Sequence, residues 1–213
     1  MVVDEAHDPV VALPFKGNVD IGKLERLIKQ VGAEQIPSVS VAATVNMAGG
    51  QPINMVNLAE VRELTCRHRI PVILDAARAV ENAWFIQQRE PGWGDRSVAE
   101  ILRAMCDLTD GAVMSAKKDS FANIGGWLGV RDPALAEQAR GLVVVHEGLH
   151  TYGGWPGGTW RRWPRASRSR CRRTASGLGS SRWRIWRRGS AGRGCRSFAR
   201  WAGTRCSWTP PGT

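Results

Sequence analysis

The sequence predicts an α/β domain with a mostly parallel β-sheet over residues 1–158, followed by a basic tail over residues 159–213. In the first part, short apolar segments alternate with segments of helical periodicity, the pattern of strands joined by crossover helices. The composition then changes. Residues 1–158 carry all 19 acidic side chains, whereas residues 159–213 carry 15 arginines, six of the ten tryptophans and no acidic residue. The net charge of +11 therefore describes neither part.

The first regular elements are a helix and a strand. Asp20 can cap a helix over residues 21–31, and Gly32 can end it. The β-branched, apolar segment over residues 38–45 predicts a buried strand that ends at Asn46. A loop rich in glycine and proline follows this strand.

The remaining elements continue the alternation. Ser97 and Glu100 have the spacing of a capping box at the start of one of the helices. Because helices separate most of the strands, we expect a parallel sheet covered on both faces. The predicted helices cover residues 57–68, 80–89, 98–107 and 133–143, and the predicted strands cover residues 70–74, 111–114 and 127–130.

Polar side chains stand where three of the predicted strands end. In parallel sheets, ligands bind beyond the carboxyl ends of the strands, so these side chains would converge on one site. Taken singly, each has another explanation, as a helix cap, a surface charge, a turn residue or a solvated pair of lysines. Together they describe a cofactor site, made of Asn46, Asp75 with Arg78, and Ser115 with Lys117 and Lys118.

The adjacent lysines suggest the chemistry of that site. An ammonium group is expensive to bury, so a lysine at the end of a buried strand usually has a use. One use is to present a neutral amine, which forms a Schiff base with an aldehyde. The alternative is a solvated loop that carries two lysines, which is the common situation for this residue type.

Four motifs, in this order and spacing, resemble the pyridoxal-phosphate-dependent β-eliminating lyases, the family of tyrosine phenol-lyase and tryptophanase. They are TVNMAGGQP at 44–52, LDAAR at 74–78, SAKKD at 115–119 and TYGG at 151–154. The resemblance covers residues 14–158. It implies the large domain of an aspartate-aminotransferase-like fold, known as fold type I, and the homotetramer of the family.

The resemblance also implies a role for each site residue. Lys118 would hold pyridoxal phosphate as an internal aldimine, and Lys117 would help to set the local charge. Asp75 would pair with the pyridinium nitrogen, which keeps the ring protonated and able to accept electrons. Arg78 and Asn46 would contact the phenolic oxygen of the ring.

Two further roles follow from the same resemblance. Ser115 would donate a hydrogen bond to the phosphate, and the amide oxygen of Asn123 would bind the potassium ion that activates this family. Tyr152 lies in a matching motif without an assigned role.

The implied reaction is β-elimination from an aromatic amino acid. Tyrosine would yield phenol, pyruvate and ammonia. Residues 44–46 and 123–126 are closer to tyrosine phenol-lyase, with tryptophanase, which releases indole from tryptophan, as the alternative. Members of the family are longer, and we recognise neither their phosphate-binding loop before residue 14 nor their C-terminal domain. We therefore expect a partial large domain with little or no lyase activity.

The tail over residues 159–213 has three interpretations. Arginine interleaved with tryptophan can bind nucleic acid through charge and stacking. The tail can also be a disordered run of charge. The third interpretation is translation out of frame, because GC-rich codons for residues 159–164, read one nucleotide earlier, give Asp-Met-Glu-Ala-Leu-Ala, the continuation found in the family. We favour the third interpretation.

Cysteine usage and hydropathy bear on the cellular setting. None of the five cysteines has metal-ligand spacing, and no signal peptide precedes them. No apolar run approaches the roughly 18 residues of a membrane span. The expected setting is a reduced cytoplasm without a membrane partner.

Overall fold

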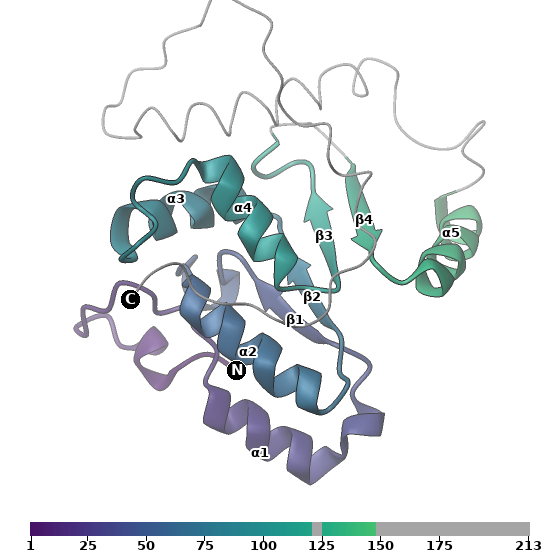
Figure 1. Cartoon of the computed structure of the whole chain (residues 1–213), viewed down its shortest axis with the longest axis horizontal. Coiled ribbons are helices and arrows are strands. Elements are labelled where there is room, and N and C mark those ends of the chain that lie inside the picture. The colour runs from purple at the N-terminus through teal and green to yellow at the C-terminus, as the bar shows by residue number, and fades with distance from the viewer. Residues whose placement is uncertain (121–124, 148–213) are drawn as a thin grey trace, which may run out of the picture.

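The computed structural model describes residues 1–120 and 125–147 of the chain (Figure 1). The α-helices in this part are α1 (Ile21–Val31), α2 (Met55–Arg67), α3 (Ala79–Arg89), α4 (Val98–Asp107) and α5 (Pro133–Glu147). The strands are β1 (Val39–Ala42), β2 (Val72–Asp75), β3 (Gly111–Ser115) and β4 (Gly126–Val130), and the 3-10 helices are η1 (Asp4–His7), η2 (Ala33–Gln35) and η3 (Asn46–Ala48).

Several predictions concern residues outside this part of the chain. They are the potassium ligand Asn123, the motif residue Tyr152, the domain boundary at residue 158 and the nature of the tail at 159–213. The disorder, the reading frame and the nucleic-acid binding of that tail stay predictions.

The strands form one sheet in the order β1-β2-β3-β4. β1 pairs with β2 and β2 with β3 in parallel, and β4 pairs with β3 in antiparallel orientation. The predicted fold class, an α/β domain with a mostly parallel sheet, is confirmed. The antiparallel β4 departs from the expected alternation because residues 116–125 join it to β3, and this connection is too short for a crossover helix.

The predicted helix caps are present at α1 and α4. The Asp20 side chain accepts a hydrogen bond from the Lys23 backbone N–H at 2.8 Å. Ser97 and Glu100 form the reciprocal contacts of a capping box. The predicted start of α2 at residue 57 was two residues late, because the side chain of Asn54 caps the helix.

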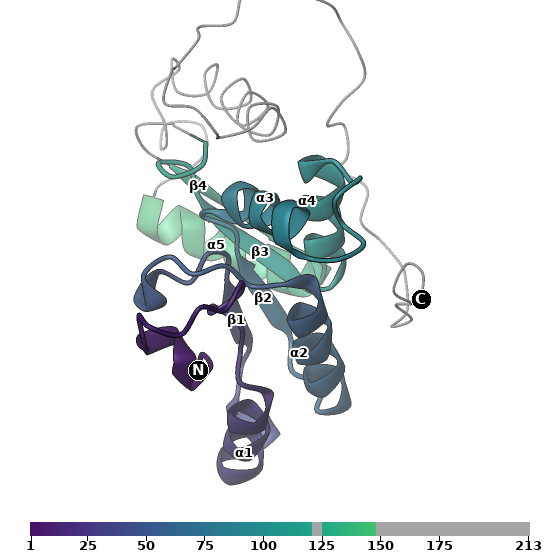
Figure 2. The same cartoon turned by 90° about the vertical axis from the view of Figure 1, so that its left-hand side faces the viewer.

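Helices α2, α3 and α4 pack against one face of the sheet (Figures 1 and 2). The central side chains of that face are apolar and buried, with Val41, Val72, Leu74 and Ala112 each at most 6% exposed. The opposite face is more open. Asp75 pairs with Val113 and Val113 with Leu128, so these three side chains share that face.

Val113 and Leu128 on the open face are 41% and 53% exposed. The expected cover of both faces is therefore not seen over these two side chains. The Asp75 side chain lies on this open face beside Val113, with which it is paired. The open face therefore leaves space next to Asp75.

The N-terminal segment packs onto the domain. Val2 forms an antiparallel bridge with Val19, the Val3 N–H donates to the Asn18 carbonyl at 3.1 Å, and Phe15 is 7% exposed. The residues before position 14 thus belong to the fold, although the first regular element predicted from the sequence begins only at residue 21.

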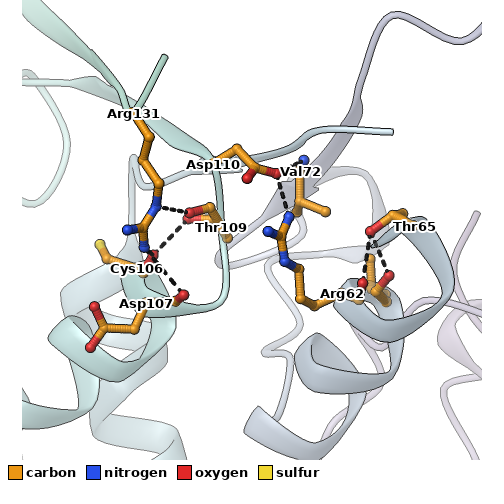
Figure 3. A network of polar contacts seen from close by, with 9 residues as sticks. Arg62, Thr65, Val72, Cys106, Asp107, Thr109, Asp110 and Arg131 are labelled. Carbon is orange, nitrogen blue, oxygen red and sulfur yellow. Dashed lines mark hydrogen bonds and ion pairs between the residues drawn. The ribbon is translucent and has the colours of Figure 1, made fainter. Parts of the chain in front are cut away.

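A polar network ties together the edge of the sheet at which β2 and β3 begin (Figure 3). The Asp110 carboxylate pairs with Arg62 of α2 and accepts from the Val72 N–H at 2.8 Å. After β4, Arg131 donates to the carbonyl oxygens of Thr109 and Cys106 at 2.8 and 3.2 Å. These contacts join α2, α4 and the three strands β2, β3 and β4 at the edge remote from the predicted site.

Candidate functional site

A cavity of about 420 Å³ lies where β1, β2 and β3 end. Five of the predicted site residues line it: Asn46, Asp75, Arg78, Ser115 and Lys118. Ala42, Thr44, Ala77, Val113, Met114, Gly125 and Gly126 complete the lining. Lys117 is not part of the lining, so the structure brings together all the predicted residues that it describes except this lysine.

Asp75 is the last residue of β2 and is partly buried. Its Oδ1 atom accepts a hydrogen bond from the Ala77 N–H at 3.0 Å. Directly after it, the Ala76 N–H donates to the Val113 carbonyl at 2.7 Å. The strand end and the turn after it therefore fix the Asp75 carboxylate at the cavity wall.

Arg78 joins two of the strand ends. Its backbone N–H donates to the Ala43 carbonyl at 3.0 Å, just beyond β1, and its Nη1 atom donates to Asn46 Oδ1 at 3.1 Å. Arg78 is also the residue immediately before α3. The guanidinium and the amide consequently face the cavity as one unit.

Asn46 is exposed and begins η3, in a tight loop after β1. The Val45 N–H donates to the Gln51 carbonyl at 2.8 Å, and the Gly50 N–H donates back to the Val45 carbonyl at 2.9 Å. Gly49 and Gly50 have φ angles of 76° and 78°, which glycine adopts without strain. The glycine pair in the 44–52 motif thus closes the loop that presents Asn46.

The lysine pair lies in the turn after β3. The Lys118 N–H donates to the Ser115 carbonyl at 3.2 Å, and the Ala116 N–H donates to the Gly125 carbonyl at 2.8 Å. Both lysine side chains are exposed. The expectation of a buried strand end is therefore wrong for the lysines, because the turn lies beyond the sheet and faces the open cavity. Within the described residues, Lys118 Nζ has no ion-pair partner.

Two residues near the cavity were missed by the sequence analysis. Thr44 lines the cavity and is 5% exposed. Asp119 follows Lys118, and its carboxylate accepts hydrogen bonds from the N–H groups of Val80 and Glu81 at 2.9 and 3.2 Å. Both residues belong to motifs already noted. No signal in the local sequence indicates that Asp119 caps a helix 39 positions earlier.

The part of the chain that the structure describes holds no group of three or more His, Cys, Asp or Glu side chains suited to a metal ion. None of its helices has the length and apolar character needed to cross a membrane.

Comparison with known proteins identifies related sequences. The model of the family described as β-eliminating lyase matches residues 2–156. The match begins earlier than residue 14, where the sequence resemblance was expected to start, in agreement with the packed N-terminal segment.

The chain is similar to curated enzymes named tyrosine phenol-lyase. Tyrosine phenol-lyase from Nostoc punctiforme is 59% identical over 157 residues, which cover 74% of this chain and 34% of the relative. The enzyme of the same name from Intrasporangium calvum is 55% identical, with 74% of this chain and 33% of the relative covered. The chain thus spans about a third of the length of the curated relatives it matches.

A search of solved structures gave more distant matches. A proposed L-allo-threonine aldolase from Listeria monocytogenes has a TM-score of 0.49 at 21% identity, covering 65% of this chain and 34% of that one. This likeness is too weak to support an inference. The family match extends over most of the chain, and on that evidence the chain belongs to the β-eliminating lyase family.

Proposed function

We propose that this chain is part of a pyridoxal-phosphate-dependent carbon–carbon lyase that converts tyrosine to phenol, pyruvate and ammonia. The relatives named tyrosine phenol-lyase, at 59% and 55% identity, support this substrate over the tryptophan of tryptophanase. The observation that carries the proposal is the set of polar groups around one cavity at the strand ends. The activity belongs to the whole protein, because the matched residues cover only 34% of the length of the first of these relatives.

The residues present fit pyridoxal phosphate. A volume of about 420 Å³ is within the range of cofactor pockets. The side chains that line the cavity offer the carboxylate of Asp75 for a ring nitrogen, and the guanidinium of Arg78 with the amide of Asn46 for a phenolic oxygen. They also offer the hydroxyl of Ser115 for a phosphate and the amine of Lys118 for an aldehyde. When bound, the cofactor supplies an electron sink for the negative charge that develops at the α-carbon of the amino acid.

Asp75 would hold a proton on the ring nitrogen. Its carboxylate is an acceptor fixed by the Ala77 N–H, so it needs no rearrangement to meet a cationic N–H. The open face on which Asp75 and Val113 lie leaves room for a flat ring against the sheet. Asp75 would thereby maintain the charge on which the electron sink depends.

Arg78 and Asn46 would orient the ring through its phenolic oxygen. The hydrogen bond between them at 3.1 Å leaves the guanidinium with further N–H donors that face the cavity. Ser115 would donate to a phosphate oxygen from the end of β3. Lys117, exposed and outside the cavity lining, would add positive charge near that anion.

Lys118 would supply the amine that binds the cofactor covalently. It lines the cavity within the same turn as Ser115, and its exposed side chain can move between the cofactor and solvent. Potassium binding at Asn123, a homotetramer and a cytoplasmic setting are further parts of the proposal that follow from the family resemblance alone.

The test is covalent trapping of the cofactor. The purified chain is incubated with pyridoxal phosphate, reduced with borohydride and mapped by peptide mass spectrometry. We expect a label on Lys118 and a visible absorbance band before reduction, and both are lost in Lys118→Ala. Lys29→Ala is the matched control, because Lys29 is an exposed lysine of α1 paired with Glu25 and remote from the cavity. Equal labelling of both variants would contradict the assignment of Lys118.

A further inference from the structure

The residue after the lysine pair is a buried carboxylate. Asp119 is 5% exposed, and its Oδ2 atom accepts from the Val80 N–H at 2.9 Å and the Glu81 N–H at 3.2 Å. These two N–H groups belong to the first turn of α3, where backbone donors lack partners within the helix and negative charge is favoured. Asp119 therefore caps, from a distant loop, the helix that begins directly after Arg78.

The main chain is anchored at the same point. The Asp119 N–H donates to the Ala77 carbonyl at 3.3 Å, and the N–H of the preceding lysine, Lys118, donates to the Ser115 carbonyl at 3.2 Å. The backbone of Asp119 thus binds Ala77 within the turn between β2 and α3, and its side chain binds the first turn of α3. The lysine loop and the segment that carries two other site residues are held as one unit.

This anchor bears on which lysine meets the cavity. Lys117 and Lys118 are neighbours with the same side chain and the same exposed character, yet only Lys118 lines the cavity. A rotation of the loop by one residue would exchange them. The anchored residue is the one immediately after Lys118, so its hydrogen bonds constrain the backbone from which the Lys118 side chain projects.

We propose that Asp119 is a positioning residue that selects Lys118 over Lys117 as the amine presented to the aldehyde of the cofactor. The proposal rests on the proposed function of the cavity. It assigns to Asp119 no contact with cofactor or substrate. Its action passes through the turn after β3 and through the start of α3.

The chain contains a matched control. Glu90 is 7% exposed, and its carboxylate accepts from the Met55 and Val56 N–H groups at the start of α2. It is the same kind of buried cap on another helix, and it carries no lysine beside it. Loss of Glu90 should weaken the fold in a comparable way without moving the lysine loop.

The experiment compares the wild type with Asp119→Ala, Asp119→Asn and Glu90→Ala. Each chain is incubated with pyridoxal phosphate, whose aldehyde condenses with a lysine amine with loss of water, and borohydride then adds hydride to the C=N bond. Peptide mass spectrometry gives the ratio of label on Lys118 to label on Lys117. We expect that ratio to fall about tenfold in Asp119→Ala, the scale of one charge-assisted hydrogen bond, and to be unchanged in Glu90→Ala.

Asp119→Asn should give an intermediate ratio, because its amide oxygen can still accept from the helix N-terminus but carries no charge. It also keeps the test informative if Asp119→Ala fails to fold. A ratio in Asp119→Asn and Asp119→Ala equal to that of the wild type would overturn the proposal. So would a fall of the same size in Glu90→Ala, since the effect would then be general destabilisation.

Amide hydrogen exchange supplies a second readout that needs no cofactor. The Lys118 and Asp119 amides should exchange faster in Asp119→Ala than in Glu90→Ala, because their hydrogen bonds depend on the anchor. If the wild type takes no label on either lysine, the proposed function of this chain fails, and the exchange rates still decide the role of Asp119. Unchanged exchange in Asp119→Ala would then refute that role.

Discussion

The two edges of the sheet use polar residues in opposite ways. At the edge where β2 and β3 begin, Asp110 and Arg131 bind backbone groups and Arg62, so that each side chain joins elements of the same fold. At the edge where the strands end, Asp75 and Arg78 each make one side-chain hydrogen bond to the described residues, and both line a cavity.

The difference separates stability from function. A polar group whose partners all lie within the chain lowers the free energy of that fold and offers nothing to a ligand. A polar group held by one contact, with donors left over, is prepared to bind something else. We call the edge where β2 and β3 begin the structural edge, and the edge where the strands end the cavity edge. Substitutions at the structural edge are expected to change the free energy of unfolding, and substitutions at the cavity edge are expected to change cofactor affinity.

The largest effect is expected for Asp110→Ala at the structural edge. The substitution leaves both the Val72 N–H and the Arg62 guanidinium without this carboxylate, at a cost of about 2 to 3 kcal/mol in the free energy of unfolding. Urea denaturation followed by circular dichroism measures it. Asp132→Ala is the control, because Asp132 is an exposed cap of α5 and its loss should cost only about 1 kcal/mol.

Asp110→Ala also tests whether the structural edge affects cofactor binding at the other edge. Folded Asp110→Ala, below its denaturation midpoint, should take the pyridoxal phosphate label on Lys118 to the extent of the wild type. Loss of that label in a chain that is still folded would mean that the two edges are coupled.

A second effect concerns Cys106 at the structural edge. Burial, as the main cause, together with the charge of Asp107, raises the pKa of this thiol to about 11 from an ordinary 9.0. Below pH 9 the thiolate fraction is therefore about a hundredfold smaller in the folded chain than in the unfolded one, and alkylation by iodoacetamide should slow accordingly.

The raised pKa of Cys106 also makes the stability of the fold depend on pH. A folded-state pKa above the unfolded value means that the protonated thiol stabilises the fold below pH 9, and that this contribution is lost as the pH rises through about 11. The alkylation rate of the folded chain should keep rising between pH 9 and about pH 11. The alkylation rate of a urea-unfolded control should instead level off near pH 9 to 10. A common profile for both states would show that the edge does not shield Cys106.

Local signals in the sequence predicted much of the fold. The caps at Asp20 and Ser97 span three residues, so their chemistry can be identified without knowing the rest of the structure. The ends of β2 and β3 were also predictable, because each apolar run stops at a polar residue, whereas β1 ends at Ala42, three residues before the predicted end at residue 45. For this reason Asn46, Asp75 and Ser115 were assigned to one site before the topology was known.

The features that escaped prediction depend on distant parts of the chain. The antiparallel orientation of β4 follows from the length of a connection and not from a pattern within the strand. The Asp119 cap spans 39 positions. The exposure of Lys118 depends on the open face of the sheet, and strand periodicity does not show which face other segments cover.

The smallest effect on stability, and a clear effect on binding, is expected for Arg78→Ala at the cavity edge. Within the part of the chain that the structure describes, its side chain makes one hydrogen bond, to Asn46. Its removal should therefore cost less than about 1 kcal/mol in the free energy of unfolding while weakening cofactor affinity about tenfold. Arg78→Lys should not restore the affinity, because an ammonium lacks the planar fork of the guanidinium. Titration of the chain with pyridoxal phosphate, followed by absorbance, measures this affinity.

Arg89→Ala supplies the converse control for Arg78. Arg89 donates to the Pro14 carbonyl at 2.9 Å and lies 4.2 Å from the centre of the Phe85 ring, so its loss should reduce stability and leave cofactor affinity unchanged. If Arg78→Ala instead destabilised the fold as much as Arg89→Ala and bound the cofactor normally, the strand-end arginine would be structural. The contrast between the two edges of the sheet would then fail at its most informative residue.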